Sequence, residues 1–214
     1  MDAKVRQRLV KALAVVDEHG TVGSRLVDDA NRLWQNVQRL LEMGLVSPEA
    51  GSECLELACY ALQLPMRDRR LLPSGKLGRT NLRDRVEQAA ELLVSVIGKE
   101  VDEAMLDRTT RILLQLPQRS ASLAEARLLA DVVNLDDFGV TGFVTRIIQL
   151  AVQGAGMTQV LDAAQKREEY GYWEARLKDG FHFEPIRQIA RRRLERARQV
   201  HKLLSDELSG DARE

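Results

Sequence analysis

Apolar residues recur at helical spacing along almost the whole 214-residue chain, and this periodicity constrains the fold more than any other feature. In the segment 26–41, for example, leucine, valine, alanine and tryptophan fall on one side of a helix. No stretch of four or more residues alternates apolar and polar side chains convincingly, as a half-buried strand would. Leu and Ala together supply about a quarter of the residues, which also favours helix over sheet. The pattern predicts an all-α protein.

Nine helices are predicted from these apolar stripes and from residues that begin or end a helix. They cover about 5–20, 26–41, 48–65, 81–97, 101–116, 123–133, 137–153, 158–178 and 184–208. Ser122 and Glu125 have the spacing of a capping box, in which each side chain bonds a backbone N–H group at the start of a helix. Short links between the helices predict one compact all-α domain over 1–208, followed by a polar tail at 209–214.

The segment 65–80 interrupts this rhythm and is predicted to be a long loop. It contains two Pro, two Gly and five basic residues against one Asp. Loops of this length often carry function. Arg67, Arg70 and Lys76 are therefore candidates for binding an anion.

The last predicted helix is rich in arginine, with Arg191, Arg192 and Arg193 in succession. Two interpretations stay open: a solvated outer face over an apolar inner stripe, or a surface that binds an anion or nucleic acid. The whole chain has 32 Lys and Arg against 32 Asp and Glu, and this balance argues against a protein that coats polyanions. Nucleic acid is therefore an alternative partner and not the favoured one.

We expect a cytoplasmic protein that does not enter a membrane. The longest segment without charge, 147–161, is too short and too polar to span a bilayer. Residues 1–20 carry charges among their apolar positions and lack the cleavage site of a secretory signal. Cys54 and Cys59 do not have CxxC spacing and are predicted to be reduced, partly buried thiols.

The residue patterns of known catalytic and cofactor sites do not stand out in this chain. The three histidines, His19, His182 and His201, are each isolated from other metal ligands at helical spacing. Adjacent carboxylates such as Asp136 and Asp137 diverge around a helix and make no ready pair of acid and base. The residues alone predict no catalytic site, no metal and no cofactor.

Two segments nevertheless resemble the HD-domain metal-dependent phosphohydrolases, in particular their small bacterial members. The first is EARLLADVVNLDDFG at 125–139, which is similar to the family's late segment, and Arg146 stands where such proteins often place an arginine. The second is YWEARLKDGFHFEPIRQIARRR at 172–193, which is similar to the family's closing segment. The resemblance extends over about 17–205 and implies a helical fold in which an H…HD…D set of residues binds one or two divalent metals for phosphoester hydrolysis.

This chain departs from that ligand set at the aligned positions. Gly23 falls on the first His, and Leu62 and Gln63 fall on the His-Asp doublet. Val133 replaces the metal-binding Asp of the late segment, although Asp131 is kept. Aliphatic side chains have no lone pair to offer, and the few amide and carboxylate groups that remain cannot replace two imidazoles and two carboxylates. The resemblance therefore implies a degenerate member with no metal centre and no catalysis.

The positions of the former cleft are Gly23, Leu62, Gln63, Asn81, Asp84, Asp131, Val133 and Arg146. Asp131 has two interpretations, since it could orient a polar ligand or bond backbone amides at a helix end. The favoured function is a catalytically silent HD-like domain that binds an unknown protein or small-molecule ligand as a regulatory module. One alternative is a metal-dependent phosphohydrolase that acts on a nucleotide or phosphomonoester through non-standard ligands. A second is an anion or nucleic-acid binder that uses the basic 65–80 loop and the arginine-rich last helix.

Overall fold

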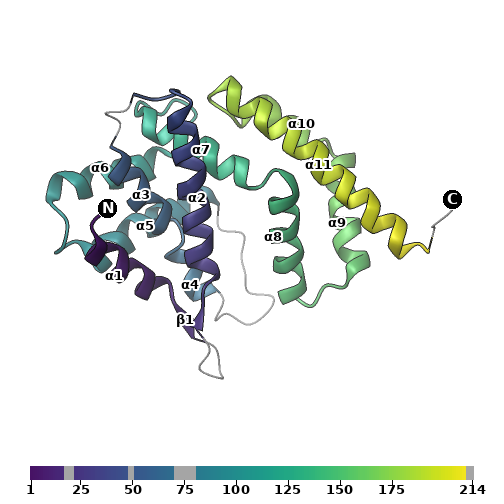
Figure 1. Cartoon of the computed structure of the whole chain (residues 1–214), viewed down its shortest axis with the longest axis horizontal. Coiled ribbons are helices and arrows are strands. Elements are labelled where there is room, and N and C mark those ends of the chain that lie inside the picture. Colours follow the sequence, from purple (N-terminus) through teal and green to yellow (C-terminus); the bar gives the residue numbers. More distant parts are fainter. Residues whose placement is uncertain (17–21, 48–50, 70–80, 211–214) are drawn as a thin grey trace. The chain divides into compact units, whose positions relative to one another are not determined.

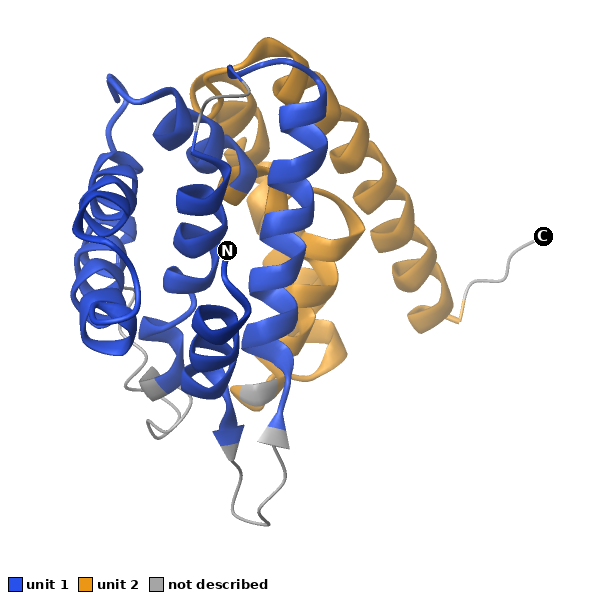
Figure 2. Cartoon of the chain, turned by 60° about the vertical axis from the view of Figure 1, so that its left-hand side comes forward, with its two compact units in different colours: residues 1–132 blue, residues 133–214 orange. Residues whose placement is uncertain are grey.

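The computed structural model describes residues 1–16, 22–47, 51–69 and 81–210, which form eleven helices and one short pair of strands (Figure 1). The all-α class is therefore confirmed. Contacts between Cα atoms divide the chain into two compact units, unit 1 (residues 1–132) and unit 2 (residues 133–214; Figure 2). The sequence predicts a single domain over 1–208, and the division into two units neither confirms nor excludes it.

Unit 1 contains seven helices, the last of which continues into unit 2, and an antiparallel pair of two-residue strands. In chain order its elements are α1 (Ala3–Leu13), β1 (Val15–Val16), β2 (Val22–Gly23), α2 (Arg25–Glu42), α3 (Ser52–Ala61), α4 (Pro65–Arg69), α5 (Leu82–Ile97), α6 (Glu103–Gln115) and α7 (Ala124–Asp136). Three of these helices begin at a side chain that accepts first-turn N–H groups: Asp2 at α1, Asn81 at α5 and Asp102 at α6.

The helix α3 lies at the centre of unit 1. Every residue from Cys54 to Ala61 is buried, and α3 packs against α2, α5 and α6. A helix that is apolar on every side is stable only inside a core. The exception in this helix is Glu56, whose buried carboxylate forms an ion pair with the Arg6 guanidinium of α1.

Unit 2 contains the end of α7 and four further helices. These are α8 (Gly139–Val152), α9 (Met157–Glu169), α10 (Tyr172–Asp179) and α11 (Glu184–Leu208). The helix α11 packs along α8 and also contacts α9 and α10. It buries Ile186, Ala190 and Leu194, which recur every four residues and so share one side of the helix. Within the described ranges, no helix is both long enough and apolar enough to cross a membrane.

Three local predictions from the sequence are wrong. After Leu13 the chain leaves the helix and forms the strand pair, in which Val16 faces Val22. The predicted helix 158–178 is two helices, because Gly171 adopts a left-handed φ of 63° and separates α9 from α10. The predicted loop 65–80 begins with the short helix α4, and its remaining residues, 70–80, lie outside the described part of the chain.

The predicted capping box at the start of α7 does not form either. The Ser122 hydroxyl and the Leu123 N–H group both donate to Oε1 of Gln115, at 3.1 and 3.0 Å. The Glu125 carboxylate instead accepts hydrogen bonds from Arg108 of α6. Gln115 of α6 therefore accepts the N–H group of Leu123, directly before α7. The Glu125 side chain joins α7 to α6 through Arg108.

Candidate functional site

The predicted cleft positions are divided between the two units. Gly23, Leu62, Gln63, Asn81, Asp84 and Asp131 belong to unit 1, and Val133 and Arg146 belong to unit 2. Leu62 and Gln63 directly follow α3 and are buried. The Arg85 guanidinium of α5 donates to the Leu62 carbonyl from Nε at 3.0 Å and from Nη2 at 2.8 Å. Its Nη2 also lies 3.4 Å from Oε1 of Gln63, so the polar atoms at this end of α3 serve to hold two helices together.

The remaining unit 1 positions have separate roles. Asn81 caps α5 by accepting the Asp84 N–H group at 2.8 Å, and the Asp84 side chain is exposed. Gly23 lies in β2 opposite Val15, and Asp131 is completely buried in α7. Among the residues that the structure describes, no group of three or more His, Cys, Asp or Glu side chains is arranged to hold a metal ion.

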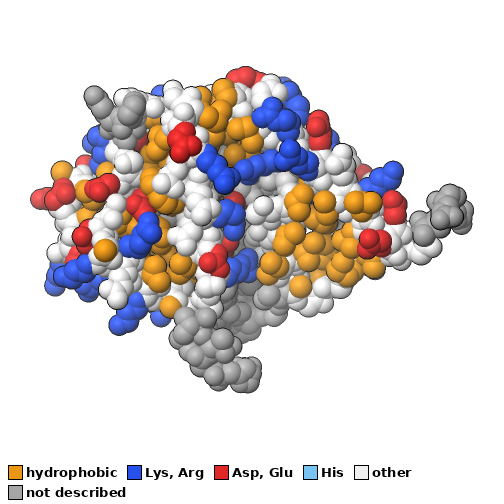
Figure 3. Space-filling view, in the orientation of Figure 1, with side chains coloured by type: hydrophobic (Ala, Val, Ile, Leu, Met, Phe, Trp, Pro, Cys, Tyr) orange, Lys and Arg blue, Asp and Glu red, His pale blue; other side chains and the backbone are white. Residues whose placement is uncertain are grey.

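The predicted anion-binding arginines of α11 make contacts inside unit 2. Arg193 is half-buried, and its Nη1 lies 3.4 Å from the carbonyl oxygen of Leu135. Arg191 donates to Oε1 of Gln188 at 3.0 Å, and Arg192 is exposed. Figure 3 shows Lys and Arg interspersed with Asp and Glu over the face in view. The arginine run of α11 is therefore partly structural.

The other predicted anion-binding residues come from the segment 65–80. Arg67 is exposed, and its Nη1 donates to the carbonyl oxygen of Ala12 at 3.3 Å. Arg70 and Lys76 lie outside the described residues. The contact of Arg67 therefore joins α4 to the end of α1 within unit 1.

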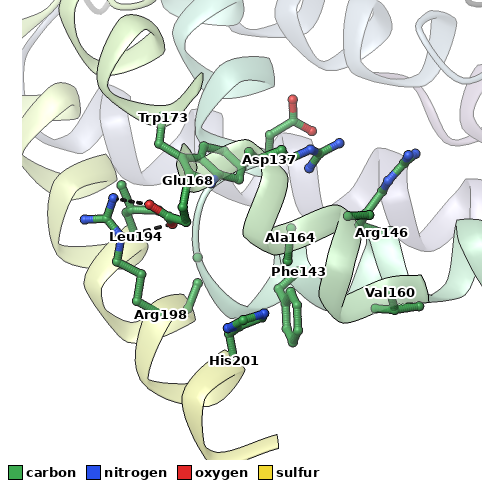
Figure 4. Close-up of a pocket in the computed structure, with 15 residues that line it drawn as sticks. Asp137, Phe143, Arg146, Val160, Ala164, Glu168, Trp173, Leu194, Arg198 and His201 are labelled. Carbon is green, nitrogen blue, oxygen red and sulfur yellow. Dashed lines mark hydrogen bonds and ion pairs between the residues drawn. The ribbon is translucent and has the colours of Figure 1, made fainter. Parts of the chain in front are cut away.

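A pocket lies in unit 2 among α8, α9, α10 and α11 (Figure 4). Its cavity volume is about 90 Å³. Most of its lining is apolar: Phe143 comes from α8, Val160 and Ala164 from α9, Trp173 from α10 and Leu194 from α11. The cleft position Arg146 also lines this pocket. A largely apolar cavity with a few polar groups is the usual form of a small-molecule site.

Small residues make room for the pocket where its helices meet. A Cβ atom at Gly142 would lie 2.1 Å from the carbonyl oxygen of Asp137, so only glycine fits at the start of α8. Ala163 and Ala164 of α9 and Ala197 of α11 face the same space. Longer side chains at these alanines would fill the cavity.

The imidazole of His201 gives the pocket an unsatisfied polar atom. Its ring stands edge-on to Phe143, with the ring centroids 6.0 Å apart (Figure 4). The Nε2 atom is buried and has no hydrogen-bond partner among the described residues. Because nearly all buried polar atoms are hydrogen-bonded, such an atom indicates a partner beyond the residues that the structure describes.

Three of the charged side chains that line the pocket, Asp137, Glu168 and Arg198, form ion pairs. Asp137 accepts from Nη1 of Arg176 at 2.7 Å. Glu168 of α9 accepts from Nε and Nη2 of Arg198 at 3.0 and 2.6 Å, and the same Nη2 lies 2.7 Å from Glu174 of α10. The hydrogen bonds from Arg198 to Glu168 are the largest influence that raises the pKa of this arginine above its usual range. Arg198 therefore joins three helices at the edge of the pocket.

An aromatic cluster supports the wall of the pocket at Trp173. The Phe138 ring meets the Trp173 ring edge-on at 5.0 Å and lies 5.5 Å from the Phe181 ring. The guanidinium of Arg167 lies over the rings of Tyr172 and Trp173, with its central carbon 5.3 and 5.8 Å from their centroids. These contacts fix the position of the indole that faces the cavity.

Unit 1 has a wider, open groove of about 590 Å³ between the starts of α3 and α6. Charged side chains of both signs line it, among them Glu53, Asp107 and Arg108. Glu125, buried nearby, accepts hydrogen bonds from Arg108 and from the Gly51 N–H group at the start of α3. The protein thus already supplies an anion at this helix end, so the unit 2 pocket is the stronger candidate for a ligand site.

Three residues with a role in the structure are not indicated by the predicted sites: Arg85, Glu125 as the partner of Arg108, and His201. A signal for His201 was present, because Leu194, Ala197 and His201 recur at helical spacing on one side of α11. Arg85 bonds the Leu62 carbonyl, and Glu125 bonds Arg108. In each case the partner lies on or next to another helix, and no local sequence pattern indicates the contact. No protein-family model, curated protein or solved structure significantly matches this chain.

Proposed function

We propose that the protein is a catalytically silent binding module and that the unit 2 pocket takes up a small-molecule ligand. The observation that carries this proposal is the combination of an apolar cavity with a buried, unsatisfied His201 Nε2 atom. Binding of a small molecule there would remove apolar surface from water and supply the missing hydrogen bond. The predicted regulatory role and the HD-like ancestry remain part of the proposal.

The contacts of Leu62 and Gln63 support the silent interpretation. An aliphatic side chain and an amide occupy the positions that align with the His-Asp doublet, and the amide oxygen is near Arg85. A guanidinium beside this position disfavours a divalent cation by charge repulsion. Stoichiometric Mn, Fe, Ni or Zn in the purified protein, found by elemental analysis, would contradict this part of the proposal.

The fluorescence of Trp173 reports directly on the pocket. The chain has two tryptophans, and Trp34 lies in α2 of unit 1, so Trp34→Phe leaves an indole only at the cavity wall. Four small probes that share one ring are titrated into this variant: methylcyclohexane, cyclohexanol, cyclohexanecarboxylate and cyclohexylammonium. We expect at least one of them to change the Trp173 emission in a saturable manner.

A pocket-filling variant and its control decide whether such a change arises in the cavity. Ala164→Leu places three additional carbons in the pocket, and we expect it to abolish saturable binding. Ala175→Leu makes the same change at an exposed position of α10 and should leave binding unaltered. Circular dichroism checks that both variants keep their helices. The proposal is wrong if none of the four probes binds, or if Ala164→Leu binds as the unsubstituted chain does.

A further inference from the structure

We infer that the ligand of the unit 2 pocket is an uncharged, largely apolar molecule with one hydrogen-bonding group, which meets Nε2 of His201. This inference rests on the proposed function and names the chemical class of its ligand. Three features of the pocket lead to it: its apolar lining, the unsatisfied imidazole nitrogen and the pairing of the charges around it.

The apolar body of the ligand follows from the lining. Phe143, Val160, Ala164, Trp173 and Leu194 present rings and aliphatic groups to the cavity from four different helices. A ring or branched alkyl group placed among them gains dispersion contacts on several sides. A molecule with polar groups all around would lose its hydration without replacement.

The single hydrogen-bonding group follows from His201. A neutral imidazole carries one N–H donor and one acceptor nitrogen, so Nε2 can serve a hydroxyl, a carbonyl or an amide. In the described residues no protein group bonds this atom, and leaving it unsatisfied is unfavourable. His201 lines the pocket beside Phe143, so a ligand group in the cavity can approach the ring and relieve this cost (Figure 4).

The neutrality of the ligand follows from the charges that face the pocket. Asp137 is paired with Arg176, and Glu168 is paired with Arg198, so these carboxylates and guanidiniums already neutralise each other. Arg198 is held a second time by Glu174. A charged ligand would have to break one of these pairs or keep its charge uncompensated against a mostly apolar lining.

Arg146 and Arg167 also line the pocket, and their guanidiniums do not favour an anionic ligand. Arg167 lies over the rings of Tyr172 and Trp173, which occupies its planar face. Arg146 comes from α8, and its Nη1 lies 3.4 Å from Oε1 of Gln149. In Figure 4 the Arg146 guanidinium points away from His201, so the two do not converge on one anionic group.

The same four probes test this class, because they share the cyclohexane ring and differ only in their substituent. In the Trp34→Phe protein we expect cyclohexanol to bind about fivefold or more tightly than methylcyclohexane, since its hydroxyl satisfies the buried nitrogen. Cyclohexanecarboxylate and cyclohexylammonium should bind more weakly than cyclohexanol. The ¹⁵N resonance of His201 Nε2 should shift with cyclohexanol and stay unchanged with methylcyclohexane.

Two substitutions at His201 separate the hydrogen bond from the shape of the pocket. His201→Leu should bring cyclohexanol to the affinity of methylcyclohexane, and His201→Gln, which keeps a polar nitrogen, should retain part of the preference. If these variants do not fold, the ranking of the four probes by affinity for the protein that retains His201 still tests the proposed ligand class. Tightest binding by the carboxylate or the ammonium probe overturns the neutral class and leaves the proposed function intact. Failure of all four probes to bind defeats the proposed function itself.

Discussion

The carboxylate of Glu125 is buried in unit 1 against the guanidinium of Arg108, whose Nε donates to Oε1 at 3.1 Å. The same carboxylate accepts the Gly51 N–H group that precedes α3. One side chain of α7 is therefore bonded to α6 and to the start of α3, the central helix of the unit. The Glu125 side chain stabilises the folded unit only while it is ionised and its hydrogen-bond donors are in place.

We expect unit 1 to lose stability in acid through Glu125. Burial is the largest influence and raises the pKa of this carboxyl, but the hydrogen bonds from Arg108 and from backbone amides together outweigh it, so the pKa lies below its usual value of 4.5. A lowered pKa means that the stabilisation is complete above about pH 4.5 and is lost as the pH falls through the folded-state value. Urea unfolding at neutral and acidic pH measures this loss.

The substitution Glu125→Gln isolates this contribution. It keeps the volume of the side chain and removes the charge, so we expect the free energy of unfolding at neutral pH to fall by about 2 kcal/mol. The loss on going to acidic pH should also be smaller in this variant. Glu91→Gln, at an exposed position of α5, is the matched control and should change neither quantity appreciably. An acid loss of equal size in Glu125→Gln and in the unsubstituted chain would assign the effect to other groups.

Both thiols of α3 are expected to be unreactive in the folded protein. Cys54 and Cys59 are free and buried, and burial is the main cause that raises the pKa of each above its usual value. Less thiolate is therefore present at mildly alkaline pH than on an exposed cysteine, and the reagent also lacks access. Ellman's reagent should label both thiols in urea and neither of them rapidly in the native state.

The variant Cys54→Ser distinguishes the two positions. Cys59 is completely buried in the middle of α3, so its labelling in this variant should require opening of unit 1, and its rate should be proportional to the equilibrium constant of that opening. Cys54 lies in the first turn of α3, where a smaller local opening suffices. Rapid reaction of Cys54→Ser in the native state would show that the core around α3 is open to solvent.

Local sequence patterns predict the helices well and the tertiary polar contacts poorly. The apolar stripe that includes Leu194 correctly indicates the inner side of α11, because helical spacing is a property of neighbouring residues. Arg85 reaches the Leu62 carbonyl from 23 positions away, and nothing near either residue indicates that pairing. The pocket lay beyond prediction for the same reason, since Phe143, Trp173 and His201 come from three helices. Its position depends on how those helices pack.

Loss of Arg85 should loosen the end of α3. The last carbonyl groups of a helix need partners beyond the helix itself, and Arg85 supplies two hydrogen bonds to that of Leu62. We expect Arg85→Ala to lower the free energy of unfolding by about 1–2 kcal/mol. Amide hydrogen exchange should increase most at the C-terminal end of α3.

Arg83→Ala is the matched control for this prediction. Arg83 lies on the same helix, is largely exposed, and pairs with Glu87 one turn away at 3.2 Å. Exposed pairs of this kind contribute about 0.5 kcal/mol or less. Equal losses in Arg83→Ala and Arg85→Ala would mean that the contacts with Leu62 add nothing to stability.

Gly139 and Gly154 share a left-handed backbone conformation but differ in their surroundings. Their φ angles are 89° and 85°, so an alanine at either position is strained, and we expect Gly154→Ala to lower the free energy of unfolding by about 1 kcal/mol. A Cβ atom at Gly154 would meet nothing within 4 Å, whereas one at Gly139 would lie 2.9 Å from Cβ of Arg193. Gly139→Ala must also displace α11 near the pocket, so it should lower stability by about 2–3 kcal/mol. Urea unfolding of the two variants checks this difference, and equal losses would show that Gly139 is needed for its backbone angle alone.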